Sequence, residues 1–95
     1  MNKYVAKLKE FTCEYFKGED VQVVFFGSRS NGTETATSDI DIGVIYRGRY
    51  GLKAGLFSEE IEALNIPYKV DIVNLSKCSS DFREKVLTEG IIWKD

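Results

Sequence analysis

Two aspartates occur in an apolar stretch that otherwise has the composition of a β-strand. Asp39 and Asp41 belong to the sequence SDIDIGVIY, in which the isoleucines Ile40 and Ile42 alternate with the acids. Carboxylates are almost never fully buried without a partner. Residues two apart in a strand point to the same face with α-carbons about 6.6 Å apart, so the two acids can converge on one ligand. The pattern predicts a sheet that presents a pair of carboxylates at the start of a strand.

The residue types around this pair predict a metal ion and a phosphate. Mg²⁺ takes oxygen ligands, usually one or two carboxylates together with waters and substrate phosphates, and Asp39 and Asp41 offer that set. Gly27 and Ser28 directly follow an earlier apolar run. A glycine there lets the backbone approach an anion, and a short helix starting at Ser28 or Arg29 would direct its amides at phosphate oxygens. Pairing with a surface acid is an equal expectation for Arg29.

A third acid, Asp71, lies inside the strand-like sequence YKVDIVNL. If that strand lies beside the one carrying Asp41, Asp71 reaches the same site, where it could share a metal and accept the proton of an attacking hydroxyl. Simpler interpretations stay open for each acid. Asp39 could form a turn with Ser38, Asp41 could be a solvated residue of an edge strand, and Asp71 could lie on the polar face of a half-exposed strand.

The composition excludes several classes of function. The 95 residues suffice for one domain and include no histidine, which removes Ser-His-Asp and Cys-His catalysis and histidine metal sites. The net charge of −2 gives no basic surface for duplex nucleic acid. Cys13 and Cys78 form no paired motif, which indicates free thiols in a reducing cytosol. No apolar run approaches the roughly 18 residues of a membrane span, so we expect a cytoplasmic chain without membrane contact.

The periodicity of apolar residues predicts an alternation of helices and strands within a single domain, residues 1–95. The first helix ends before Gly18 and places Cys13 on its outer side, and Asp81 with Glu84 resembles a capping box for the last helix. The expected elements are a helix over 4–16, strands over 21–26 and 40–46, a helix over 52–64, a strand over 68–75, a helix from 80 or 81 to 90, and an edge strand over 91–94. Residues 58–60 either lie inside the helix over 52–64 or restart it after a break.

The spacing of these residues resembles a known signature. It has the pattern GSxxxGxxxxxSDxD, formed here by Gly27, Ser28, Gly32, Ser38, Asp39 and Asp41. This pattern is similar to that of the DNA polymerase β-like nucleotidyltransferases, in particular the minimal nucleotidyltransferases of prokaryotes. The third aspartate, Asp71 in the sequence VDIVNL, also matches, and the resemblance covers almost the whole chain.

The resemblance implies an α+β nucleotidyltransferase fold of the polymerase β palm type, with a mixed β-sheet and helices packed mainly on one face. It also implies a nucleoside triphosphate, with ATP as the expected one, and Mg²⁺ as cofactor. The implied site consists of catalytic and metal-binding Asp39, Asp41 and Asp71, and of nucleotide-binding Gly27, Ser28, Arg29 and Ser38. One departure is that Ser30 and Asn31 replace the alanine and basic residue of many relatives, which would weaken nucleotide binding.

The resemblance further implies a partner. Similar proteins are commonly encoded beside an all-helical HEPN-type toxin and act as its antitoxin, by transferring AMP from ATP to a tyrosine hydroxyl of the toxin. Two functions stay open: a nucleotidyltransferase that modifies its protein partner, and an antitoxin that neutralises the partner by complex formation, with weak or no catalysis. Transfer to a small molecule such as an aminoglycoside would need a second domain to hold the acceptor. Homo- and hetero-oligomers are both compatible with the chain.

Overall fold

The computed structural model describes residues 3–26, 40–48 and 51–95, which form three α-helices, four strands and one short 3₁₀ helix. In chain order these are α1 (Lys3–Tyr15), β1 (Val21–Phe26), β2 (Ile40–Tyr46), α2 (Leu52–Glu62), β3 (Val70–Asn74), the 3₁₀ helix η1 (Leu75–Lys77), α3 (Ser80–Glu89) and β4 (Ile91–Lys94). Within the described part of the chain, no helix is long and apolar enough to cross a membrane.

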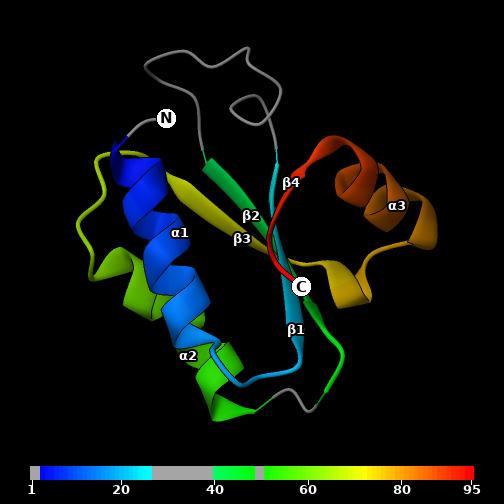
Figure 1. Cartoon of the computed structure of the whole chain (residues 1–95), viewed down its shortest axis with the longest axis horizontal. Helices are drawn as coiled ribbons and strands as arrows, with labels where there is room; N and C mark the ends of the chain where they lie inside the picture. Colours follow the sequence, from blue (N-terminus) through cyan, green and yellow to red (C-terminus); the bar gives the residue numbers. More distant parts are fainter. Residues whose placement is uncertain (1–2, 27–39, 49–50) are drawn as a thin grey trace.

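The four strands form one mixed sheet in the order β3-β2-β1-β4. Strand β1 is antiparallel to both β2 and β4, whereas β3 runs parallel to β2. Helices α1 and α2 lie on one side of the sheet and α3 on the other, as Figure 1 shows. This confirms the expected α+β fold, with two of the three helices on one face.

Successive side chains of each strand point to opposite faces of the sheet, so the sheet contributes to two hydrophobic cores, one on each face. The larger core joins α1 and α2 to the sheet, and its aromatic centre is the contact between Phe16 and Phe57, whose ring centroids are 4.8 Å apart. The smaller core lies under α3 and contains Val24, Leu75 and Val86. Because β1 contributes to both cores, its uninterrupted apolar sequence is explained by burial on two faces.

Two elements begin or end differently from the expectation. Strand β3 begins at Val70 rather than at Tyr68 and ends at Asn74 rather than at Leu75. It ends there because the Asn74 side chain accepts a hydrogen bond from the Ser76 amide at 3.0 Å and starts the 3₁₀ turn. Helix α3 is capped by Ser79, whose hydroxyl accepts from the Phe82 amide at 3.2 Å, so the predicted cap at Asp81 is wrong by two positions.

Two further differences concern the helices on the other face. Helix α2 is continuous through Ser58 and ends at Glu62. Beyond it the amides of Leu64 and Asn65 donate to carbonyl oxygens three residues back, and Asn65 then adopts a left-handed conformation with φ of 54°. Cys13 does not face outward. Its Sγ lies 3.3 Å from the carbonyl oxygen of Trp93, since β4 packs beside α1.

Gly43, in the middle of β2, permits the close approach of the chain on the α3 side of the sheet. A Cβ atom at this position would lie 2.5 Å from Cδ1 and 3.0 Å from Cγ of Leu75, and 3.2 Å from the Phe26 ring. Leu75 is fully buried. The absence of a side chain at Gly43 therefore fixes where η1 and the Phe26 ring rest on the sheet.

We predict that Gly43→Ala destabilises the fold by about 1 to 3 kcal/mol, the usual cost of overpacking a buried site. The measurement is the free energy of unfolding from urea titration. Gly55→Ala is the matched control, because a Cβ there meets nothing within 4 Å and the residue lies within α2. The control should be stabilised by up to about 1 kcal/mol through helix propensity. Equal effects of the two substitutions would contradict the close approach at Gly43.

Candidate functional site

The sheet brings Asp41 and Asp71 together. In the parallel ladder between β2 and β3, Asp41 is the register partner of Asp71, and on its other side Asp41 is the register partner of Phe26 in β1. Register partners point to the same face of a sheet, and neighbouring strands are about 4.8 Å apart. The prediction that the strand of Asp71 lies beside the strand of Asp41 is therefore confirmed.

These carboxylates lie on the α3 side of the sheet, beyond the part that α3 covers. The row Phe26, Asp41, Asp71 lies at the end of the sheet where β1 finishes and β2 begins. The next row on the same face contains Gly43, over which Leu75 and the Phe26 ring are packed. The packing of the smaller core stops before the row that contains the carboxylates. Asp41 and Asp71 therefore lie at the margin of this core, within reach of solvent.

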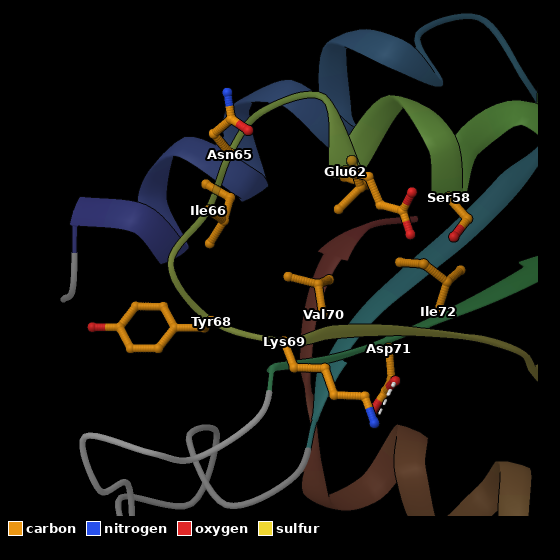
Figure 2. Close-up of a pocket in the computed structure, with 10 residues that line it drawn as sticks. Ser58, Glu62, Asn65, Ile66, Tyr68, Lys69, Val70, Asp71 and Ile72 are labelled. Atoms are coloured by element: carbon orange, nitrogen blue, oxygen red, sulfur yellow. Dashed lines mark ion pairs between the residues drawn. The ribbon is translucent and has the colours of Figure 1, made fainter.

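Asp71 is paired with a lysine. Its side chain is 43% exposed, and its Oδ1 lies 3.9 Å from Nζ of Lys69, which is 70% exposed (Figure 2). An ion pair with this exposure contributes little to stability, about 0 to 1 kcal/mol. The ion pair holds the Lys69 ammonium group at the edge of the candidate site. Lys69 precedes Asp71 by two residues, so the two side chains lie on the same side of the chain.

The other predicted site residues lie outside the described residues. They are Gly27, Ser28, Arg29, Ser38 and Asp39, and all of them belong to the segment 27–39. The two residues that flank this segment are Phe26, which is in the row of the carboxylates, and Ile40, which precedes Asp41. The roles assigned to these residues in phosphate and metal binding stay predictions.

The donor set at this end of the sheet suits a hard divalent cation. Asp41 and Asp71 supply carboxylate oxygens from neighbouring strands, and Mg²⁺ requires only one or two protein carboxylates when phosphates complete its shell. Among the residues that the structure describes, no group of three or more histidine, cysteine, aspartate or glutamate side chains forms a metal site. Asp39, the third predicted ligand, is not among them.

Two neighbours of the site were not predicted from the sequence. Lys69 could have been found, because strand alternation puts it on the face of Asp71. Phe82 could not, because α3 brings it to the sheet through tertiary packing. Its ring meets that of Phe26 edge to face, with centroids 6.4 Å apart, and its side chain is half exposed. The two rings form an apolar wall beside Asp41.

A hollow of about 560 Å³ adjoins the site at the outer edge of β3 (Figure 2). It lies between α2, the turn after α2 and β3, and Asp71 is one of its lining residues. The wall from α2 includes Ser58 and Glu62, and the wall from β3 includes Val70 and Ile72. The site is thus open toward the edge strand of the sheet.

Comparisons with known proteins agree with this geometry. A search of curated proteins gives no match. Among solved structures, the chain is similar to one described as "Crystal structure of the toxin-antitoxin with AMP-PNP", with a TM-score of 0.66 and 27% sequence identity over 90% of this chain and 71% of that chain. Residues 7–94 match the protein family described as "Polymerase beta, Nucleotidyltransferase". Since this match extends over nearly all of the sequence, the chain belongs to the polymerase beta nucleotidyltransferase family.

Proposed function

We propose that this protein is a Mg²⁺-dependent nucleotidyltransferase that transfers a nucleoside monophosphate, AMP from ATP, to a hydroxyl of a protein partner. We further propose that it acts in this way as the antitoxin of a HEPN-type toxin. The observation that carries the proposal is the register of Asp41 with Asp71 on neighbouring parallel strands, where both residues are half-buried. Membership of the nucleotidyltransferase family and the likeness to a toxin-antitoxin structure with AMP-PNP support it.

The proposed reaction divides the acids between nucleotide and acceptor. Asp39, Asp41 and Asp71 would hold Mg²⁺, which when bound supplies positive charge to neutralise the triphosphate. Asp71 lies on the outer strand of the pair with its side chain 43% exposed, and is the candidate for the acceptor side. There it takes the proton of the acceptor hydroxyl, whose oxygen forms a bond to the α-phosphorus. The bond from that phosphorus to the oxygen bridging to the β-phosphate breaks, and pyrophosphate leaves.

Lys69 and Phe82 have supporting roles in this proposal. The ammonium group of Lys69 beside Asp71 adds positive charge where the phosphates approach. The wall of Phe26 and Phe82 places apolar surface beside Asp41. Both effects strengthen the interaction of the site with a charged substrate.

The second candidate is an antitoxin that works by binding alone. It is favoured by the contact between Lys69 and Asp71, because a cation on this carboxylate competes with a metal ion. The replacement of the basic residue of many relatives by Asn31 points the same way. The mass of the partner decides between the two candidates.

We predict that Mg²⁺ with ATP raises the melting temperature of the protein. The proposed site would hold Mg²⁺ and the nucleotide in the folded state alone, and a ligand that binds only the folded state stabilises it by RT ln(1 + [L]/Kd). At ten times Kd this is about 1.4 kcal/mol, or about 6 to 11 °C for a chain of this size.

In the same measurement, Asp41→Asn should lose most of the shift. Asp20→Asn is the matched control, since Asp20 is an exposed aspartate at the opposite end of the sheet and pairs with Arg47 at 3.2 Å. Absence of any shift in the wild-type protein would contradict the proposed nucleotide site.

We predict that the double variant Asp39→Asn with Asp41→Asn binds the partner normally and fails to modify it. The amides are nearly isosteric with the carboxylates but are poorer ligands for Mg²⁺. The measurement is the intact mass of the partner after co-expression with each form. A partner that is silenced by the wild-type protein without any added nucleotide would exclude the catalytic candidate and establish the binding antitoxin.

We predict that Asp71→Asn leaves binding of Mg²⁺ and ATP nearly intact and slows transfer by about 10²- to 10⁴-fold, the usual cost of losing a general base. Nucleotide affinity by titration and single-turnover transfer over a range of Mg²⁺ concentrations measure the two effects separately. A variant that cannot bind nucleotide, or that transfers at the wild-type rate, would show that Asp71 does not act on the acceptor. A changed dependence on Mg²⁺ would assign Asp71 to a second metal instead.

A further inference from the structure

Strand β3 presents an open edge beside the proposed site. It is the outermost strand of the sheet formed by the described residues. The amide of Ile40 donates to the carbonyl oxygen of Lys69 at 2.9 Å, which sets the alternation of the parallel ladder. In this register the backbone groups of Asp71 are directed toward β2, and those of Val70 and Ile72 are directed away from it. The outward groups are those that a further strand would bind.

The two faces of this edge differ in chemistry. Val70 and Ile72 point toward α2, whereas Lys69 and Asp71 lie on the opposite side of the β3 ribbon (Figure 2). All four residues line the hollow, which continues around the edge of the strand. Successive residues of a strand added to β3 would point alternately to these two faces. One side chain would therefore face Asp71, and the side chains before and after it would enter the hollow.

The hollow suits a long side chain with a positive end. Its floor is apolar, with Ile61, Val70 and Ile72, while Ser58 and Glu62 provide polar groups from α2. Figure 2 shows the carboxylate of Glu62 directed toward the strand. In the part of the chain that the structure describes, no ion pair neutralises Glu62, in contrast to Asp71. Lysine and arginine lay an apolar stem along such a floor and bring their charge to an acid at the rim.

We propose that the β3 edge binds an extended segment of the protein that receives the nucleotide. The acceptor hydroxyl residue of this segment faces Asp71, and a neighbouring lysine or arginine occupies the hollow with its charge against Glu62. The inference rests on the proposed function for the identity of Asp71 as the acceptor-side residue. Strand addition supplies affinity through main-chain hydrogen bonds, and the alternate side chains supply the choice of partner.

The first test uses two short peptides as probes, each acetylated, amidated and fluorescently labelled. Both have a central tyrosine in a β-forming sequence, with lysine on both sides of the tyrosine in one and glutamate in the other. We expect the wild-type chain with Mg²⁺ and ATP to bind and modify the lysine peptide in preference, as measured by fluorescence anisotropy and peptide mass.

Glu62→Lys should weaken binding of the lysine peptide by roughly three- to tenfold and strengthen that of the glutamate peptide, as expected when a partly exposed charge pair is reversed. Glu59→Lys is the matched control, with the same change of charge on an exposed residue of α2 that does not line the hollow. The melting-temperature shift with Mg²⁺ and ATP should be the same in both variants and in the wild type. Equal effects of the two variants on peptide choice would overturn the inference.

The second test addresses strand addition without changing the protein. Methyl groups are placed on alternate amide nitrogens of the lysine peptide, in two sets. One set should abolish binding, because its amides face β3, and the other should leave binding intact. Equal loss or equal retention in both sets would exclude a strand at this edge.

These outcomes separate the inference from the proposed function. If the protein modifies its partner but neither Glu62→Lys nor the methylated peptides changes the interaction, the docking edge is wrong and the transferase stands. If the peptides bind with the expected dependence on Glu62 and no nucleotide is transferred, the docking edge stands and the chemistry is wrong. A dimer in sedimentation equilibrium that the lysine peptide cannot dissociate would assign the β3 edge to a second copy of the chain and overturn the inference.

Discussion

The parallel pairing of β2 with β3 is the constraint on which the site depends. Parallel neighbours cannot be joined by a tight turn and require a crossover, which here contains α2. The crossover places α2 on one face of the sheet, over Val70 and Ile72. The alternate residues Asp41 and Asp71 are therefore directed to the other face, where no crossover helix covers them. The crossover through α2 thus covers alternate residues of β2 and β3 and leaves Asp41 and Asp71 on the face that it does not cover.

The second determinant is how far α3 extends over that open face. Leu75 and the Phe26 ring are packed directly on Gly43, and Phe82 covers the outer side of the Phe26 ring. This packing ends one row before the carboxylates, because the next position of β2 on this face is Asp41. A larger residue at Gly43 would displace these side chains toward the acids. The stability of the smaller core and the access to the site are therefore linked through one position.

Local patterns were sufficient to predict β1, β2 and β4, because each is a short β-favouring run with clear limits, and Asp41 inside β2 points directly to the candidate site. The predictions that were wrong failed because of a side-chain hydrogen bond or a contact between residues far apart in the sequence. Strand β3 is shortened by the Asn74 side chain, and Cys13 is half-buried because β4, 80 residues away along the chain, packs against α1. The adjacency of Asp41 and Asp71 could be stated only conditionally from the sequence, since strand order depends on long-range pairing.

The two edges of the sheet are protected to different degrees, and this difference bears on where a partner binds. Strand β4 has four residues, its register with β1 shifts between Val23 and Val24, and it ends in Lys94, which together are the usual means of preventing further pairing. Strand β3 has five residues, all half-buried, with no irregularity in its ladder to β2, and its one charged side chain is Asp71 on the site face. The regular, unprotected edge of β3 therefore lies beside the carboxylate that the proposed function assigns to the acceptor. In that proposal, an acceptor segment paired with β3 would bring its hydroxyl to Asp71.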